Sequence, residues 1–141
     1  MRKFLSDYGL YFAWIIAIVA TAGSLYFSEV KLFVPCTLCW YQRILMYPFV
    51  ITLAIASFKQ DKQIIKYALP ISVLGIFVAT YHVLEQNLAG FGAPALCKLG
   101  VPCSTKYIGL FGIEFLSIPV LSLIAFVLIS FLLIMASLNK E

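Results

Sequence analysis

Charged side chains are scarce in this sequence. Lys and Arg number 10 and Asp and Glu number 6 among 141 residues, so charged residues make up 11% of the chain against 63% hydrophobic residues. A soluble domain carries about 25% charged residues, so this composition excludes an apolar core wrapped in a polar surface. The basic residues are scattered between apolar runs and form no stripe interleaved with aromatics, which excludes a nucleic-acid partner. Lipid must therefore be the main solvent of this chain.

The sequence shows no internal repeat and no low-complexity tract, and 141 residues suit a single domain. Four apolar stretches cover residues of about 10–27, 40–58, 67–84 and 115–138. Each approaches or exceeds the roughly 20 residues that a helix needs to cross a bilayer, and lipid leaves the backbone no other hydrogen-bond partners. The sequence predicts an all-α four-transmembrane-helix bundle forming one membrane domain over residues 1–141. The first stretch is longer than the apolar part of a signal peptide, about 7–15 residues, although Ala20-Thr21-Ala22 is compatible with cleavage.

Basic residues are divided unequally between the two ends of the predicted helices. One end carries Arg2, Lys3, Lys59, Lys62, Lys66 and Lys140, and the other carries Lys31, Lys98 and Lys106. Positive residues favour the cytoplasmic side, so we expect both termini in the cytoplasm and loops 28–39 and 86–114 outside a bacterial cell membrane. These two loops hold all four cysteines. Disulfides persist in such oxidising compartments.

Cys36-Thr37-Leu38-Cys39 is a C-x-x-C motif that follows Pro35 and leads directly into the second apolar stretch. Proline suits the first turn of a helix, so we expect the pair at a helix N-terminus. The helix dipole there favours a thiolate and lowers the pKa of a cysteine, which favours disulfide exchange. A structural bridge and half of a zinc site are alternatives that the motif alone leaves open.

Arg43 lies four residues after Cys39 and seven after Cys36, which predicts that the three share a helix face. An arginine inside a membrane span indicates a functional role by default. It could stabilise a thiolate or hydrogen-bond a carbonyl oxygen of a bound ligand. The alternative is a guanidinium that reaches the headgroup region without a ligand.

Cys97 and Cys103 lie in the one long loop predicted, where a soluble protein could reach them, and Lys98 would modestly favour a thiolate at Cys97. A zinc site made by all four thiolates is conceivable, but zinc needs reduced cysteines. That requirement fits poorly with an extracytoplasmic loop, so we expect no metal.

Three other polar residues lie near the same end. His82 and Glu85 share a face at the end of the third span, and could shuttle protons, contact a ligand or pair with the loop backbone. Glu114 opens the fourth span and suits a helix N-terminus. The sequence assigns none of them a role.

The chain resembles the DsbB/BdbC family of membrane thiol–disulfide oxidoreductases over essentially its whole length. The family pattern P-C-x-L-C-x-[YF]-x-R is matched by Pro35-Cys36-Thr37-Leu38-Cys39-Trp40-Tyr41-Gln42-Arg43, and Gly112-Ile113-Glu114 through Pro119 is also similar. The small size and the close spacing of Cys97 and Cys103 resemble the BdbC branch of Gram-positive bacteria.

This resemblance implies a role for each cysteine pair. Cys97–Cys103 would oxidise a thioredoxin-like partner of the DsbA/BdbD type, and Cys36–Cys39 would reoxidise that pair. Cys39 would lie nearest a membrane quinone, with Arg43 beside the quinone ring oxygen; a Gram-positive source would imply menaquinone rather than ubiquinone. Vitamin-K-epoxide-reductase-like proteins are an alternative within redox chemistry, because they reduce or oxidise quinones from a similar four-helix bundle. Their loop cysteines usually precede the C-x-x-C motif, which is the reverse of the order here, so they fit this sequence less well. A non-enzymatic membrane protein, a transporter or a scaffold subunit, is the alternative from another class.

Overall fold

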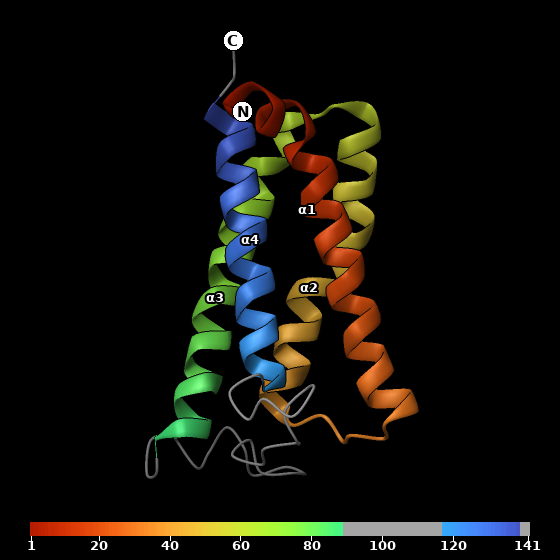
Figure 1. The fold of residues 1–141 in the computed structure, drawn as a ribbon, viewed down its shortest axis with the longest axis vertical. Coiled ribbons are helices and arrows are strands. Elements are labelled where there is room, and N and C mark those ends of the chain that lie inside the picture. Colours follow the sequence, from red (N-terminus) through yellow and green to blue (C-terminus); the bar gives the residue numbers. More distant parts are fainter. Residues whose placement is uncertain (89–116, 139–141) are drawn as a thin grey trace.

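The computed structural model describes residues 1–88 and 117–138, and four long helices make up most of them (Figure 1). They are α1 (Arg2–Leu25), α2 (Thr37–Lys59), α3 (Ile65–Asn87) and α4 (Ile118–Leu138). A π-helical turn at Tyr26–Val30 extends α1, and a 3₁₀ turn at Lys62–Ile64 leads into α3. All four are long and apolar enough to cross a membrane. The predicted four-helix membrane bundle is confirmed; residues 115–116 of the fourth expected span lie outside the described residues.

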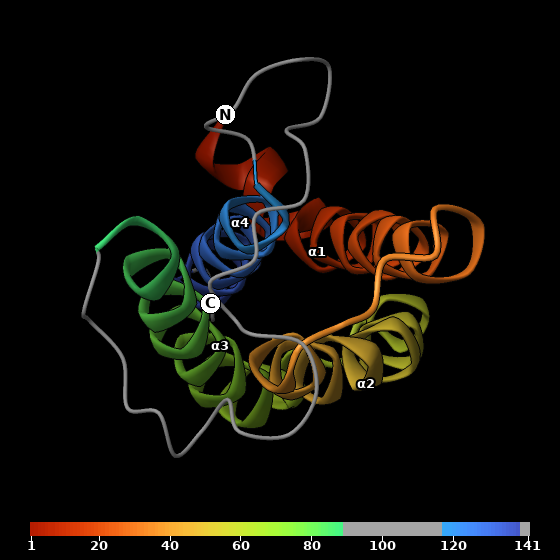
Figure 2. The same cartoon turned by 90° about the horizontal axis from the view of Figure 1, so that it is seen from below.

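The helices form a closed ring in which each packs against the next along the chain and α4 packs against α1 (Figure 2). The start of α1, the end of α4 and the α2–α3 connection lie at one end of the bundle, which we call the terminal end (Figure 1). Cys36 lies at the opposite end, where α2 begins, and we call this the cysteine end. The assignment of the terminal end to the cytoplasm stays a prediction.

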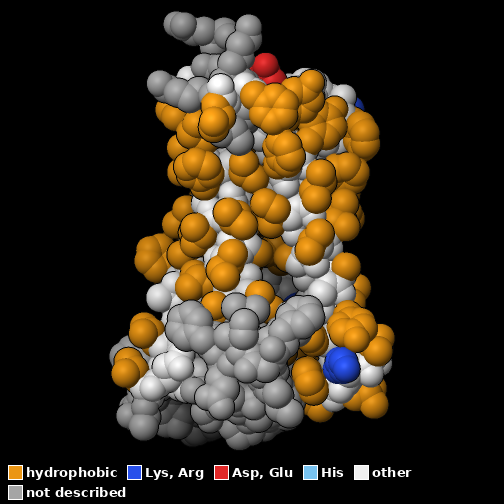
Figure 3. Space-filling model, viewed as in Figure 1, with side chains coloured by type: hydrophobic (Ala, Val, Ile, Leu, Met, Phe, Trp, Pro, Cys, Tyr) orange, Lys and Arg blue, Asp and Glu red, His pale blue; other side chains and the backbone are white. Residues whose placement is uncertain are grey.

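Large apolar side chains point outward along much of the height of the bundle (Figure 3). The most exposed on the long helices include Ile44, Ile51, Phe58, Tyr67 and Phe77, each more than 60% exposed. Such a surface would be a strong aggregation liability in water, and it suits a lipid environment. The composition of the chain is therefore explained by where its apolar side chains lie.

Small residues bring α1 and α4 close together near the terminal end. Ala13 and Ala17 of α1 and Ala136 of α4 are completely buried. A β-carbon added at Gly9 would lie 3.1 Å from the carbonyl oxygen of Leu132 and 3.2 Å from Cβ of Ala136. Membrane helices associate through such small-residue contacts, because lipid gives them little hydrophobic driving force.

Helices α3 and α4 are joined by a polar contact and by an aromatic ring. The hydroxyls of Ser72 and Ser130 lie 2.8 Å apart in the buried interface. One turn further along α3, the fully buried ring of Phe126 packs against the backbone at Gly75. These contacts fix the rotation of α3 and so determine which way His82, two turns beyond Gly75, faces.

Candidate functional site

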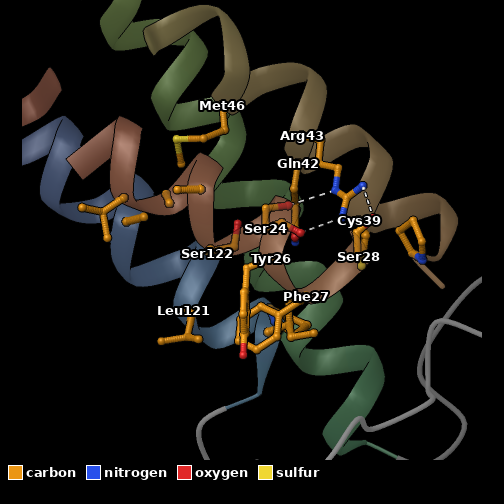
Figure 4. Close-up of a pocket in the computed structure, with 18 of the residues that line it drawn as sticks. Ser24, Tyr26, Phe27, Ser28, Cys39, Gln42, Arg43, Met46, Leu121 and Ser122 are labelled. Atoms are coloured by element: carbon orange, nitrogen blue, oxygen red, sulfur yellow. Dashed lines mark hydrogen bonds between the residues drawn. The ribbon is translucent and has the colours of Figure 1, made fainter. Parts of the chain in front are cut away.

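A cavity of ≈ 1090 Å³ lies at the cysteine end. Toward this end α1 diverges from α4, as both views of the bundle show (Figures 1 and 2). The cavity lies between the diverging helices and is bordered on its other sides by the first turns of α2 and the end of α3. Its lining is mainly aliphatic and aromatic, and its polar side chains include Cys39, Gln42 and Arg43 of α2 and Ser24 of α1 (Figure 4). Ligand pockets typically measure about 300–1,000 Å³, so a sizeable apolar ligand fits here.

Cys36 and Cys39 line this cavity at the N-terminus of α2. Cys36 is the N-cap residue, with an extended backbone (φ −76°, ψ 174°), and its carbonyl accepts the backbone N–H of Trp40 at 3.2 Å. Both cysteines are free thiols, and their Sγ atoms lie 3.2 Å apart. The predicted position at a helix start is confirmed, although Pro35 precedes the N-cap instead of occupying the first turn.

His82 reaches Cys36 from α3, across 46 residues of sequence. Its Nε2 atom lies 3.6 Å from Cys36 Sγ, and its Nδ1 atom lies 3.3 Å from Nε2 of Gln42 on α2. His82 is 1% exposed and Gln42 is 5% exposed. Buried polar groups of this kind are costly unless they are hydrogen-bonded. The three side chains therefore form one connected chain from α2 to α3 and back to α2.

Cys36 lies just outside the span that begins at Thr37, and the groups around its thiol favour the ionised form. The hydrogen bond from Cys39 is the main cause, and together with the hydrogen bond and charge of His82 it lowers the pKa of Cys36 to about 4, although burial opposes the shift. Stabilisation of the charged form by donors is a general way to depress a pKa. Cys36 is therefore a thiolate at neutral pH when the pair is reduced.

Arg43 lies one turn after Cys39 on α2 and connects α2 to α1 through hydrogen bonds (Figure 4). Its Nε donates to Ser24 Oγ at 2.9 Å, one terminal nitrogen donates to the Ser24 carbonyl at 3.0 Å, and the other reaches Ser28 Oγ at 3.5 Å. The guanidinium also lies 5.4 Å from the centre of the Trp40 ring. Arg43 and the two cysteines line the same cavity. Its hydrogen bonds within the described part of the chain go to α1 rather than to a thiol.

Two residues of this site were not assigned by the sequence. The sequence allows His82 a functional or a structural role and gives no role to Gln42. Gln42 lies three residues after Cys39, on the same side of α2, and this spacing was the available signal. Glu85 is half-buried in the last turns of α3. Cys97, Cys103 and Glu114 lie outside the described residues, so the roles predicted for the two cysteines stay predictions.

Comparison with known proteins identifies the family. The family model "Disulfide bond formation protein DsbB" matches residues 7–136. The chain is 53% identical to disulfide bond formation protein C of Bacillus subtilis over 120 residues, which cover 85% of this chain and 86% of that protein. It is 45% identical to a probable disulfide formation protein of Coxiella burnetii over 144 residues, covering 100% and 97% of the two chains. No solved structure gives a significant match.

These matches cover almost the entire chain, including the helix that starts at the C-x-x-C motif and the arginine that follows it. They agree with four membrane-spanning helices and a free cysteine pair beside an apolar cavity. The chain belongs to the DsbB family of disulfide bond formation proteins and is a membrane-spanning oxidoreductase that forms disulfide bonds.

Proposed function

We propose that this protein reoxidises a thioredoxin-like extracytoplasmic partner and passes the electrons to a membrane quinone. One observation carries the proposal: a thiol pair at a helix N-terminus opens onto an apolar cavity of ≈ 1090 Å³ within the bundle. A cysteine pair that only bridged two segments would not need an apolar space beside it. A lipid-soluble electron acceptor would need such an apolar space.

The proposed cycle balances two electrons and two protons. The partner's dithiol becomes a disulfide as Cys97–Cys103 is reduced, and that dithiol in turn reduces the Cys36–Cys39 disulfide. The reduced Cys36–Cys39 pair returns to a disulfide by giving two electrons and two protons to the quinone, which becomes a quinol. Each thiol–disulfide step proceeds through attack by a thiolate, and a sulfur of low pKa leaves fastest. The low pKa of Cys36 therefore makes it a good leaving group when the Cys97–Cys103 dithiol attacks the Cys36–Cys39 disulfide.

Arg43 and the apolar lining suit a quinone. A guanidinium at the cavity wall can donate to a ring oxygen and stabilise the negative charge that develops on it. The Ser24 and Ser28 contacts hold Arg43 in place without neutralising its charge, because both partners are uncharged. Bulky apolar side chains of α1 and α4 line the cavity opposite α2, and they suit an isoprenoid tail. In a Gram-positive source the quinone would be menaquinone.

The test is anaerobic mixing of the protein in lipid nanodiscs with a quinone and a reduced thioredoxin-like protein. Quinone absorbance reports reduction. We expect reduction by the wild type, and none by Cys36→Ser or Cys39→Ser. Ser57→Ala is the matched control, because Ser57 is a buried polar residue of α2 near the terminal end, away from the cavity.

Full activity in either cysteine variant would refute the proposal. Thiol trapping on a gel adds a second measurement, since an exchange-active pair becomes accessible under mild reduction that leaves an inert bridge oxidised. A pair that stays oxidised when the partner is reduced would exclude electron flow through Cys36–Cys39.

A further inference from the structure

Three metal-ligating atoms converge at the wall of the cavity. The Sγ atoms of Cys36 and Cys39 and a ring nitrogen of His82 all lie within 4.8 Å of one another. Cys36 is 6% exposed and His82 is 1% exposed, so packing holds two of the three ligands in place. The set contains two thiols and one imidazole, which are the ligand types that zinc and other thiophilic divalent cations prefer.

The distances from Cys36 to the other two ligand atoms are close to those of a tetrahedral site. Zn–S bonds of about 2.3 Å and Zn–N bonds of about 2.0–2.1 Å put two sulfurs about 3.8 Å apart and a sulfur and a nitrogen about 3.6 Å apart. The observed separation of Cys36 Sγ and His82 Nε2 is 3.6 Å and needs no change. The two Sγ atoms lie 3.2 Å apart, so they would separate by roughly 0.6 Å to reach that geometry. Cys39 is only half-buried and can supply this movement by rotating its side chain.

Gln42 can orient His82 as a ligand. Its side-chain amide faces Nδ1 at 3.3 Å and can present either its NH₂ group or, after a half turn, its carbonyl oxygen. With the carbonyl oxygen in place, Nδ1–H donates to Gln42 and the lone pair of Nε2 is free for a metal. With the NH₂ group in place, Nε2–H donates to the Cys36 thiolate. Metal-bound histidines almost always donate their second N–H in the first of these ways.

Charge and access also suit a cation. Two thiolates, a neutral imidazole and a divalent cation have no net charge, which limits the cost of burying the complex at the edge of a membrane. The cavity borders all three side chains. It therefore leaves room for a fourth ligand, as in sites that keep one open position.

We propose that the reduced Cys36–Cys39 pair and His82 bind one Zn²⁺ or a similarly thiophilic divalent cation. Binding releases the remaining thiol protons and changes no oxidation state. The two sulfurs cannot join in a disulfide while both are ligands, so the metal holds the pair reduced, and oxidation of the pair by two electrons expels it. This site differs from a resident zinc site made by all four thiolates, because it exists only in the reduced half of the cycle. Its effect on turnover rests on the proposed function; the binding does not.

The experiment uses the full chain in nanodiscs with Cys97→Ser and Cys103→Ser, so that Cys36 and Cys39 supply the only thiols. The reduced protein is freed of reductant under anaerobic conditions and titrated with Co²⁺ as an optical probe. We expect one Co²⁺ per chain, with a sulfur-to-cobalt charge-transfer band that Zn²⁺ abolishes. The disulfide form should show no such band. X-ray absorption of the Zn²⁺ form should find two sulfurs at about 2.3 Å and one nitrogen at about 2.0 Å.

Variants separate this site from metal binding by the cysteines alone. Gln42→Leu should weaken Co²⁺ binding about 10- to 100-fold, as loss of an orienting partner typically does, and His82→Phe should weaken it at least as much. Gln42→Glu should bind at least as tightly as the parent, because a carboxylate accepts from Nδ1–H. Ser57→Ala, a buried polar change in α2 near the terminal end, should bind as the parent does. Circular dichroism and a single elution peak verify folding.

Absence of the charge-transfer band in the reduced parent would overturn the proposal. Equal affinity in His82→Phe and the parent would also overturn it, since the cysteines would then bind without histidine. Neither measurement uses a quinone or a partner protein, so failure here leaves the proposed function standing, and failure of quinone reduction leaves the metal site standing.

Discussion

Replacing Gly75 with alanine adds a methyl group at the tightest contact between α3 and α4. The new β-carbon would overlap Cε1 and Cδ1 of Phe126 and lie 2.7 Å from Cζ. Carbon atoms that are not bonded prefer separations of about 3.5–4.0 Å. Phe126 is completely buried, so its ring cannot swing out of the bundle. Either the ring shifts against its buried neighbours or one of the two helices moves.

The expected cost is that of an overpacked core, about 1–3 kcal/mol. At about 4 °C per kcal/mol for a domain of this size, the apparent Tm should fall by roughly 4–12 °C. The assay is thermal unfolding in nanodiscs by intrinsic fluorescence. All variants are scanned at one rate, because membrane proteins seldom unfold reversibly. Displacement of α3 would also move His82 from Cys36, so quinone reduction should fall in the variant at temperatures where it remains folded.

Gly23→Ala is the matched control, because nothing lies within 4 Å of a β-carbon added there. Alanine favours a helix over glycine by up to about 1 kcal/mol, so this variant should be as stable as the wild type or slightly more stable. In a double-mutant cycle, Phe126→Leu should offset part of the cost of Gly75→Ala, with a coupling of about 0.5–3 kcal/mol. A Gly75→Ala variant as stable as Gly23→Ala would refute the packing described for α3 and α4.

The cavity wall gives two further predictions. Arg43→Lys keeps the charge but cannot form the paired contacts with Ser24. Without those contacts the side chain is no longer held where it can donate to the quinone ring oxygen. A hydrogen bond to a charged group contributes about 1.5–3 kcal/mol, so its loss should raise the KM for quinone about tenfold or more. An unchanged KM would exclude Arg43 from the acceptor site. The pKa of Cys36, lowered to about 4 chiefly by Cys39 and then by His82, makes Cys36 a thiolate throughout pH 6–8. Its alkylation rate in metal-free buffer, followed by mass spectrometry of the Cys36 peptide, should therefore be nearly constant over that range; a rise near tenfold per pH unit, as for an ordinary thiol of pKa about 8.5, would contradict it.

The helices and the position of the first cysteine pair could be predicted from the sequence. Apolar runs near 20 residues have no other fold in lipid, and Cys36 precedes such a run at the point where its helix starts. The extension of α1 through the π-helical turn at Tyr26–Val30 was not predicted. The turn contains neither Gly nor Pro, so no local signal marked it.

The contact between His82 and Cys36 could not be predicted, for a physical reason. In a soluble helix the buried face is apolar and the outer face is polar, so the sequence tells which way a residue points. In this bundle both faces are apolar, and the rotation of α3 is set by packing instead. The contact of Gly75 with Phe126 is one of those that set it, and neither residue type indicates the other in the sequence.

The close packing of Gly9 and Ala136 at the terminal end and the cavity at the cysteine end give the two halves of the bundle unequal local stability. Openings of the helix backbone should begin at the cysteine end, where the cavity lies between α1 and α4. A ligand that fills the cavity stabilises the folded state through its binding energy, by about 2.7 kcal/mol at 100 times its Kd. A lipid-soluble electron acceptor would then act as part of the core, and the protein would be most resistant to unfolding in membranes that supply it in oxidised form.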